Sequence, residues 1–331
     1  MNKAIKYIIT DETNPYKNLA LEEYLLHQVG DEECILYLWQ NERTVVIGRN
    51  QNPWKECRLK ELEADGGRLV RRLSGGGAVF HDLGNLNFTF LAAKDNYDVD
   101  KQLEVIVKAV NRLGIPAVKS GRNDITVDGR KFSGNAFYSD GKHCYHHGTL
   151  LVDVDMTKLS LYLNVSKDKL VSKGVDSVKS RVTNLREYAA ELTIEKMKER
   201  LISAFGEVYS LTPTLLELPE DDSLIIQQLE EKFSSWDWKF GRKMEFSDSL
   251  SRRFTWGDIE IKLVVEAGII KECAVYSDAL ETELLEQLPV YLKGSPFTAR
   301  AMVEALERVP LNTETTIIMI DIKAFISEYD L

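Results

Sequence analysis

A run of three glycines most constrains what this chain can fold into. Gly75, Gly76 and Gly77 belong to the segment RRLSGGGAVFHD at residues 71–82, which lies between two runs of strand character. A loop without Cβ atoms leaves its backbone N–H groups open to a ligand. Glycine runs are also common in flexible turns, so the triplet alone leaves a plain turn and a ligand loop both open.

Two arginines open this loop. Arg71 and Arg72 directly follow the strand-like residues 68–70. A guanidinium group can hold a carboxylate or a phosphate through two parallel hydrogen bonds. The arginine pair therefore favours a loop that binds an anion over a plain turn.

Length and composition indicate a soluble globular protein of two domains. The chain has 331 residues, 44% of them hydrophobic and 28% charged, with a mean hydropathy of -0.24. No apolar stretch approaches the length of about 18 residues that spans a bilayer, and the N-terminus has no leader pattern. We therefore expect a cytoplasmic protein that does not bind membranes.

Charge and cysteine content exclude further classes. The net charge is -10, and residues 244–331 carry 16 Asp and Glu against 8 Lys and Arg, so a nucleic-acid partner is not expected. The four cysteines, Cys34, Cys57, Cys144 and Cys273, form no CxxC pair. This spacing predicts reduced thiols rather than a disulfide framework or a zinc site built from cysteine.

Apolar spacing and turn residues predict a mixture of strands and helices. Strands are expected at residues 4–9, 35–39, 44–48 and 85–91, and helices at 15–26, 53–64, 103–113, 156–163 and 193–205. Hairpins are expected between residues 124 and 153, turned at 128–129 and 140–141. In the strand at 85–91, Leu86, Phe88 and Phe90 would share one face, opposite Asn85, Asn87 and Thr89.

A second unit is predicted near the C-terminus. Residues 1–241 would form the first domain, 242–250 a linker and 251–331 a small α+β domain. Strands are expected there at residues 254–256, 259–266 and 269–276, and helices near 281–292 and 297–309.

The hairpin at residues 121–135, GRNDITVDGRKFSGN, is the second candidate for chemistry. Asn123 and Asp124 begin one strand, while Lys131 and Ser133 lie two apart on the returning strand and should point to the same side. The hairpin can bring the carboxylate and the lysine together. Such a set could hold Mg²⁺ near phosphates, although a surface hairpin with an Asp-Gly turn is an open alternative.

The segment HCYHHGTLL at residues 143–151 suggests a metal site, but the spacing opposes one. In a strand, His143 and His147 would lie on one face about 13 Å apart, which is too far for one ion. Cys144 and His146 share the other face without a third ligand nearby in the sequence. A structural or substrate-lining role for His147 is the favoured interpretation.

Familiar catalytic motifs are absent. Ser74 lies in no GxSxG elbow, no GK[ST] follows the glycine loop, and no GxGxxG occurs. What remains is a glycine loop for an anion, an Asn/Asp/Lys hairpin and a basic stretch at residues 164–184, which is either a solvated loop or a flap over an anion. This combination suits the activation of a carboxylate by a nucleotide.

Several strings closely resemble bacterial lipoate-protein ligases. They are TVVIGRNQNPWKEC (44–57), RRLSGGGAVFHDLGNLNFTF (71–90), GRND (121–124), GRKFSG (129–134), HHGTLL (146–151) and VKSRVTNL (178–185). The resemblance is dense over about residues 1–240 and weaker beyond. It implies an α+β fold, with a large mixed or antiparallel sheet in a catalytic domain of the biotin/lipoate ligase type, and a small C-terminal α+β domain.

The resemblance also implies a reaction in two steps. Lipoate and ATP would give lipoyl-AMP and pyrophosphate, and the lysine of a carrier protein would then attack the adenylate and release AMP. The carriers would be apo lipoyl domains of 2-oxoacid dehydrogenase E2 subunits or the glycine-cleavage H protein. ATP would be a substrate, Mg²⁺ a cofactor, and the ligase a monomer.

Roles for individual residues follow from the resemblance alone. Lys131 would be catalytic and contact both the lipoate carboxylate and the α-phosphate, and Asp124, with Asn123, would position Mg²⁺ or phosphate. The lipoate and ATP loop would comprise Arg71, Arg72, Ser74, Gly75, Gly76, Gly77, Ala78, Val79 and Phe80. Other lining residues would be Ser133, Gly134, His147 and Gly148, with Lys173 and Arg181 on a flap over the adenylate at residues 169–182. An apolar slot for the dithiolane arm would involve Val79, Phe88 and Phe90.

The sequence disfavours three rival functions. An octanoyltransferase with a catalytic cysteine is disfavoured because no cysteine occurs between Cys144 and Cys273. Biotin ligase is disfavoured because RRLSGGG replaces its GRGR-type loop. A binder of lipoate or nucleotide without turnover is opposed by the presence of Lys131, Asp124 and both arginines.

Overall fold

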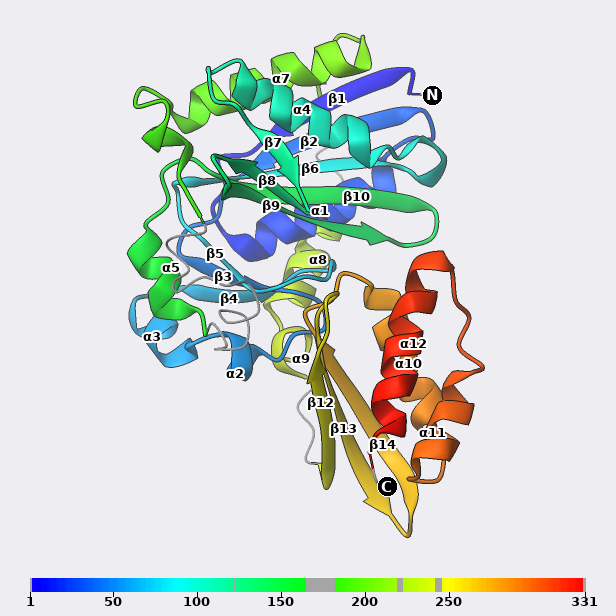
Figure 1. The fold of residues 1–331 in the computed structure, drawn as a ribbon. Coiled ribbons are helices and arrows are strands. Elements are labelled where there is room, and N and C mark those ends of the chain that lie inside the picture. The colour runs from blue at the N-terminus through cyan, green and yellow to red at the C-terminus, as the bar shows by residue number, and fades with distance from the viewer. Residues whose placement is uncertain (1, 122, 165–181, 219–222, 242–245, 330–331) are drawn as a thin grey trace. The chain divides into compact units, whose positions relative to one another are not determined.

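The computed structural model describes residues 2–121, 123–164, 182–218, 223–241 and 246–329. The chain forms two compact units, and each contains more than one segment of the sequence (Figure 1). The first unit consists of Met1–Val46, Cys57–Val70 and Val79–Lys239, and the second of Ile47–Glu56, Arg71–Ala78 and Phe240–Leu331.

The first unit is built on an eight-stranded mixed sheet. Its strand order is β11-β1-β2-β6-β10-β9-β8-β7. The strands are β1 (Ala4–Ile9), β2 (Glu33–Trp39), β6 (Asn85–Ala93), β7 (Val118–Ser120), β8 (Asp124–Val127), β9 (Arg130–Ser139), β10 (His143–Leu151) and β11 (Thr214–Leu215). Strand β1 runs parallel to both of its neighbours, and the pairs from β2 to β7 are antiparallel. The mixed, largely antiparallel sheet predicted from the sequence is confirmed.

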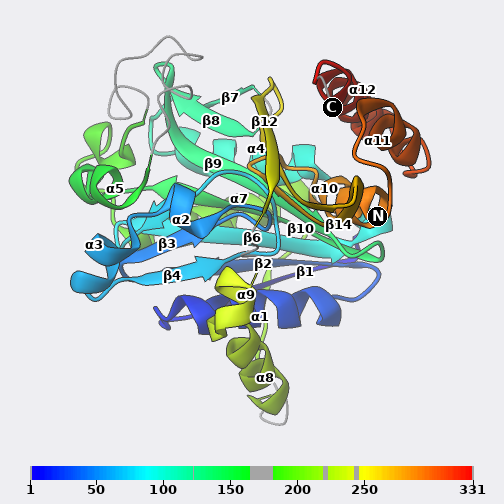
Figure 2. The ribbon, with the colours of Figure 1, turned by 90° about the horizontal axis from the view of Figure 1, so that it is seen from below.

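Helices cover both faces of this sheet (Figures 1 and 2). Helices α1 (Pro15–Gln28) and α8 (Ser223–Ser234) pack together on one side. Helices α4 (Val99–Asn111) and α7 (Ile194–Tyr209) contact each other on the opposite side. Apolar residues of α4 and α7 join Leu86, Phe88 and Phe90 of β6 in one core. All nine residues of β6 are buried, so this central strand is covered on both faces.

Local sequence explains where these helices begin. Helix α1 starts after Asn14, whose side chain accepts a hydrogen bond from the Tyr16 N–H at 3.1 Å, with Pro15 as its first residue. Helix α4 starts after Asp98, which accepts from the Lys101 N–H at 3.0 Å. Capping side chains therefore satisfy N–H groups that the first helical turn leaves unpaired.

A smaller three-stranded sheet and several short helices complete this part of the chain. Its strand order is β4-β3-β5, and β3 pairs antiparallel with β5. The strands are β3 (Thr44–Ile47), β4 (Arg68–Arg71) and β5 (Val79–His81). Short helices here are α3 (Leu59–Ala64), η1 (Lys94–Asn96), α5 (Met156–Tyr162), η2 (Leu185–Glu187) and α9 (Trp236–Phe240). Helix α2 (Pro53–Glu56) belongs to the second unit.

In the second unit, residues 246–329 form an antiparallel sheet in the order β12-β13-β14 and the helices that follow it. They are β12 (Asp248–Arg253), β13 (Asp258–Glu266), β14 (Ile269–Ser277), α10 (Thr282–Leu292), α11 (Ala299–Leu306) and α12 (Thr313–Ser327). Ile261 and Leu263 of β13 pack with Leu288 of α10 and Phe325 of α12 in a separate hydrophobic core. The small α+β domain expected from the sequence is present.

Two predicted elements are wrong. The single helix expected at residues 53–64 is split into α2 and α3, because Cys57 between them forms an isolated bridge with Leu163. The strand expected at 254–256 is a turn in which the Phe254 N–H bonds the Gly257 carbonyl at 2.7 Å. The strand precedes it as β12, which begins at Asp248 within the range expected to be linker.

Among the described residues, no helix combines the length and the apolar character needed to cross a membrane.

Candidate functional site

The β8–β9 hairpin joins the carboxylate and the lysine that the sequence singled out. Asp128 and Gly129 turn the chain with positive φ angles of 50° and 75°. Lys131 Nζ lies 2.6 Å from Asp124 Oδ1, and both side chains are about one-third exposed, at 34% and 30%. The predicted meeting of carboxylate and lysine is confirmed, and the pair is open to solvent.

A β-bulge decides what lies beside Lys131. Ile125 pairs with Ser133, but Thr126 pairs with Lys131, so Phe132 is an extra residue on β9. The strict alternation that would put Lys131 and Ser133 on the same side is thereby interrupted. Ser133 is fully buried opposite the core residue Ile125. The prediction that Lys131 and Ser133 share a side is wrong for this reason.

Two glycines give the strands room at this point. A Cβ on Gly134 would lie 2.7 Å from Lys131 Nζ. On β10, a Cβ on Gly148 would lie 2.5 Å from the Phe88 ring and 2.7 Å from the Gly134 carbonyl oxygen. Neither position can accept a side chain without displacing its neighbours. Gly148 is therefore required by its ring and backbone neighbours, whereas a side chain at Gly134 would displace the end of Lys131.

Asn135 fixes the loop that precedes Asp124. Its backbone N–H and side-chain Nδ2 both donate to the Asn123 carbonyl, at 2.9 and 3.1 Å, and Asn123 Nδ2 donates to the Asn135 carbonyl at 3.1 Å. Asn135 Oδ1 also lies 2.8 Å from His146 Nε2. Burial lowers the pKa of His146 to about 3, so this imidazole is neutral. Sequence reasoning missed Asn135 and His146 as supports of Asp124.

His147 follows His146 in β10, so its side chain points to the other face of the sheet, where it belongs to a buried network. Its Nδ1 lies 2.8 Å from Glu22 Oε1 of α1, and the Thr89 hydroxyl donates to the same oxygen at 2.6 Å. Thr89 in turn accepts from Trp39 Nε1 at 3.1 Å. Glu22 is only 1% exposed, and its partner lies 125 residues further along the chain, so sequence spacing offered no signal for it.

Val182 and Thr183, at the end of the stretch predicted to be a flap, are hydrogen-bonded to strand β9 beside Lys131. The Thr183 N–H donates to the Lys131 carbonyl at 2.9 Å, and Arg130 Nη2 donates to the Val182 carbonyl at 3.1 Å. Arg130 Nη1 also pairs with Glu187 at 2.8 Å. Lys173 and Arg181 lie outside the described residues.

In the second unit, Arg71 organises a neighbouring backbone turn. Its guanidinium is buried, and Nη1 donates to the carbonyls of Gly48, Arg49 and Gln51 at 3.2, 3.0 and 2.7 Å. The Gly48 N–H donates to Gln51 Oε1 at 2.9 Å. At least part of the hydrogen-bonding capacity of Arg71 therefore holds residues 48–51 in shape.

Arg72 likewise donates hydrogen bonds that hold the glycine loop in shape. Its Nε donates to Ser74 Oγ at 3.0 Å, and its Nη2 donates to the carbonyls of Gly75 and Gly77 at 2.6 and 2.9 Å. Gly76 has a φ of +89°, and its N–H donates to the Ala279 carbonyl at 3.2 Å. The loop is thus held by side-chain and backbone bonds rather than being a free turn.

The remaining predicted residues of the loop differ in exposure. A Cβ on Gly77 would meet nothing within 4 Å, so this glycine faces open space. In the first unit, Val79 pairs with Val46 and is half-buried, while the buried Phe80 packs on Tyr162 with ring centroids 5.2 Å apart. Phe88 and Phe90, expected beside an apolar slot, are fully enclosed in the core.

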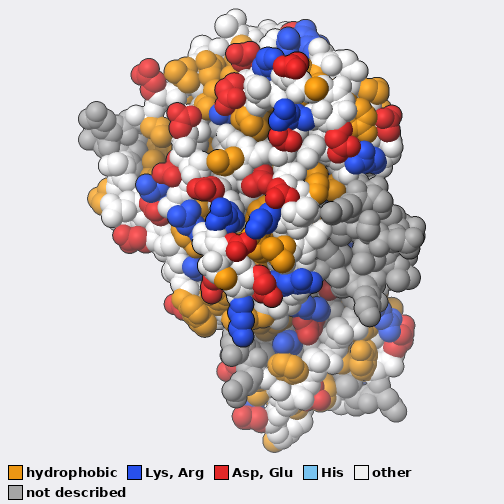
Figure 3. All heavy atoms as spheres, turned by 90° about the vertical axis from the view of Figure 1, so that its left-hand side faces the viewer, with side chains coloured by type: hydrophobic (Ala, Val, Ile, Leu, Met, Phe, Trp, Pro, Cys, Tyr) orange, Lys and Arg blue, Asp and Glu red, His pale blue; other side chains and the backbone are white. Residues whose placement is uncertain are grey.

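Charged side chains on one face of the first unit are interspersed by sign. Figure 3 shows Lys and Arg beside Asp and Glu there rather than one broad basic area. Local ion pairs include Lys158 with Asp65 at 2.9 Å and Lys108 with Glu207 at 3.3 Å. Such exposed pairs contribute little stability.

Two family models match this chain. Residues 14–206 match the lipoyl protein ligase A/B catalytic domain, and residues 243–327 match the bacterial lipoate protein ligase C-terminus. A curated lipoate-protein ligase A from Psychrobacter cryohalolentis is 44% identical over 284 residues, which cover 83% of this chain and 84% of that protein.

The fold of this chain is similar to that of several solved structures. LipL1 of P. falciparum in complex with lipoate has a TM-score of 0.86 at 28% identity, covering 98% of this chain and all of that one. A bipartite lipoate protein ligase of Thermoplasma acidophilum, described with its E2 lipoyl domain, has a TM-score of 0.66 at 26% identity over 74% and 99%. A lipoate-protein ligase A bound with ATP has a TM-score of 0.63 at 26% identity over 73% and 99%.

The first of these matches, over residues 14–206, includes the β8–β9 hairpin with its paired lysine and aspartate. The chain belongs to the lipoyl protein ligase A/B family. Its second matched region corresponds to the C-terminal part of the bacterial lipoate protein ligases.

Proposed function

We propose that this chain is an ATP-dependent lipoate-protein ligase. It converts free lipoate and ATP to lipoyl-AMP and pyrophosphate, and then transfers the lipoyl group to a lysine of a carrier protein, releasing AMP. A free carboxylate is a poor electrophile, and adenylation gives its carbonyl a good leaving group. The observation that carries this proposal is the ion pair between Lys131 and Asp124 on the β8–β9 hairpin.

Lys131 would act electrostatically in both steps. Its ammonium would contact the lipoate carboxylate and the α-phosphate, where negative charge develops as each bond forms. Loss of one such donor typically lowers the rate about 10²- to 10³-fold. Lys131 pairs with Asp124 at 2.6 Å, and it would not itself be acylated.

Asp124 and Asn123 fit a role beside Mg²⁺ and phosphate. Asp124 is partly exposed, and its Oδ1 lies 2.6 Å from Lys131 Nζ, so a hard carboxylate oxygen is present beside the lysine. Mg²⁺ prefers one or two such oxygens together with water and phosphate. When bound, the ion would neutralise charge on the triphosphate, while Asp124 would continue to orient Lys131.

The glycine loop would hold the anionic parts of lipoate and ATP. Hydrogen bonds from Arg72 to Ser74, Gly75 and Gly77 would preset the shape of this loop. Arg71 would preset the adjoining residues 48–51 in the same way. The bare Gly77 would let a ligand approach the backbone. Residues 75–80 would then read the nucleotide through backbone groups, as the sequence resemblance implies.

The wall of the site would come from β10 and from the residues before Thr183. His147 and Gly148 would line it, with Glu22 holding the imidazole of His147 in one orientation. Residues 169–182 would close over the adenylate and exclude water from a hydrolysable intermediate. The anchoring of Thr183 on Lys131 gives such a flap a fixed end.

The acceptor would be an apo lipoyl domain of a 2-oxoacid dehydrogenase E2 subunit or the glycine-cleavage H protein. The ligase of Thermoplasma acidophilum described together with its E2 lipoyl domain supports the first of these. We further propose that the ligase acts as a monomer in the cytoplasm, where its four free cysteines would remain reduced.

Mass spectrometry of the acceptor tests the function. The purified chain is incubated with lipoate, Mg²⁺ and either apo acceptor, with and without ATP, and we expect one lipoyl group to be added only when ATP is present. Lys131→Ala, checked for folding by circular dichroism, serves as the inactive control. Unmodified acceptors in every reaction would contradict the proposal.

A thiol-dependent acyltransferase is the alternative within this fold, and the cysteines oppose it. Burial raises the pKa of Cys34, Cys57 and Cys273 to about 12, which leaves almost no thiolate at neutral pH. Cys144 is buried as well. Transfer from an octanoyl carrier protein without ATP would be the positive sign of that activity.

A further inference from the structure

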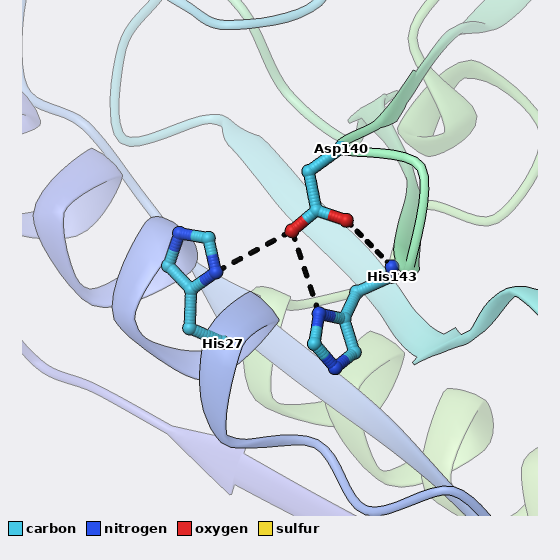
Figure 4. Close-up of side chains that lie close together, drawn as sticks. All are labelled: His27, Asp140 and His143. Atoms are coloured by element: carbon cyan, nitrogen blue, oxygen red, sulfur yellow. Dashed lines mark hydrogen bonds and ion pairs between the residues drawn. The ribbon is translucent and has the colours of Figure 1, made fainter.

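Three potential metal ligands meet at the end of α1. His27 lies in the last turn of this helix, and Asp140 and His143 lie at the turn between β9 and β10 (Figure 4). One ligand atom from each residue lies within 4.8 Å of the other two. The group joins parts of the chain more than 100 residues apart and plays no part in the ligase chemistry proposed above.

The two distances to Asp140 Oδ2 match those between neighbouring ligands of a shared metal ion. Asp140 Oδ2 lies 3.4 Å from His27 Nδ1 and 3.4 Å from His143 Nδ1. Charge-assisted N–H···O bonds are shorter, at about 2.7–2.9 Å. Around a tetrahedral Zn²⁺ with bonds of about 2.0–2.1 Å, neighbouring ligand atoms lie about 3.3–3.4 Å apart.

The turn aims one carboxylate oxygen at both imidazoles. Asp140 Oδ1 accepts the backbone N–H groups of Lys142 and His143, at 2.8 and 2.6 Å, and this leaves Oδ2 toward the two rings. Asp140 is therefore an oriented ligand, with one carboxylate oxygen fixed by the turn and the other facing the imidazoles.

Accessibility and the helix dipole also favour a cation here. The side chain of His27 is 49% exposed, whereas that of His143 is 9% exposed and forms the inner wall. An ion from solution can therefore reach the group. The C-terminal end of a helix carries partial negative charge, and His27 lies in the last turn of α1, so a bound cation would be stabilised by this charge.

We propose that His27, Asp140 and His143 bind one divalent transition-metal ion such as Zn²⁺, with a fourth position open to water or to an external ligand. Two imidazoles and a carboxylate form a donor set that suits zinc and its neighbours and disfavours Ca²⁺ or Mg²⁺. The ion would tie the end of α1 to the β9–β10 turn. Because it binds the folded chain, it would also raise the thermal unfolding midpoint.

Metal binding by the tag-free full chain tests this proposal. Equilibrium dialysis against Zn²⁺ at neutral pH should give one ion per chain. Co²⁺ should replace it and give the visible absorption bands of a tetrahedral nitrogen and oxygen site. A thiolate-to-Co²⁺ charge-transfer band would instead place the ion on a cysteine and overturn the assignment, as would the absence of binding.

Substitutions locate the ion. His27→Gln should weaken Zn²⁺ binding by about tenfold or more, and so should Asp140→Asn. Lys142→Gln is the matched control, because it changes the same turn without removing a ligand, and it should bind normally. If circular dichroism shows that Asp140→Asn misfolds, His27→Gln decides alone, since His27 is exposed at a helix end. Undiminished binding by His27→Gln would overturn the proposal.

Discussion

The ammonium of Lys131 occupies the space that a side chain on Gly134 would fill. A Cβ at residue 134 would lie 2.7 Å from Lys131 Nζ and 2.8 Å from Lys131 Cε. The β-bulge on β9 produces this relationship, because it shifts the side-chain alternation by one residue. Gly134 therefore contributes to the position of Lys131 simply by having no side chain.

Gly134→Ala should displace Lys131 while the fold is retained. The added methyl group would force Nζ away from Asp124, and a displacement of about 1 Å at a reacting group can lower the rate about 10²-fold. Lipoate-dependent ATP–pyrophosphate exchange measures this loss. Gly30→Ala is the control, because its Cβ would meet only the Glu33 side chain, at 3.2 Å. Normal exchange by Gly134→Ala would show that this close approach is not needed.

Part of this site could be predicted because its signals are local. The Asp128–Gly129 turn is written in adjacent residues, and it brings Asp124 and Lys131 together. The bulge was not predictable from alternation, because that rule assumes one residue opposite one across the strand pair, whereas Phe132 is an extra residue on β9. Ser133 was therefore expected beside Lys131, whereas it lies buried opposite Ile125.

Contacts between distant segments could not be predicted in the same way. His147 was expected to be structural or substrate-lining, but nothing in the sequence indicated that Glu22 would be its partner. His143 was judged only against its neighbours in one strand, and His27 on α1 was missed. Both pairings depend on how α1 packs on the sheet, which is a property of tertiary structure.

The strands of the main sheet were easier to predict than the C-terminal helices. In β6, apolar and polar residues alternate, and Phe88 and Phe90 lie in the core while Thr89 is on the other face, as predicted. The contact of Thr89 with Glu22 was not predicted. Helix α12 was not predicted. Its apolar residues fall on several faces, with Ile317 and Ile320 exposed and Ile318 buried, so they show no clean helical period.

Glu22→Ala should destabilise the first unit. The substitution would remove the buried carboxylate that accepts from Thr89 and contacts His147, leaving polar groups unpaired in the interior. A loss of about 2–5 kcal/mol in the free energy of unfolding is expected. Urea denaturation measures it. The control is Glu32→Ala, which breaks the exposed pair with Lys3 and should cost less than about 1 kcal/mol. Equal losses in the two variants would argue against the buried network.

Thiol alkylation should leave ligase activity nearly unchanged. Burial raises the pKa of Cys34, Cys57 and Cys273 to about 12, so these thiols are largely inert toward iodoacetamide and cannot supply a nucleophile. The treated chain should still lipoylate an apo acceptor within about twofold of the untreated rate, since adenylation needs no thiol. Complete inactivation, with circular dichroism unchanged, would indicate a catalytic cysteine instead.

His146 should make the stability of the first unit depend on pH. Burial lowers its pKa from 6.5 to about 3, so between these values the unfolded chain binds a proton that the folded chain does not. Stability from this group is present above pH 6.5 and is lost as the pH falls through that window, by about 1.4 kcal/mol per pH unit.

Urea denaturation at about pH 7 and about pH 5 should therefore show a larger drop in the free energy of unfolding for the natural chain than for His146→Gln, which has no imidazole to protonate. The comparison cancels the packing cost of the substitution, because that cost is present at both pH values. Equal drops in the two chains would mean that His146 titrates as freely when folded as when unfolded, contrary to its enclosed position between Asn135 and Gln102.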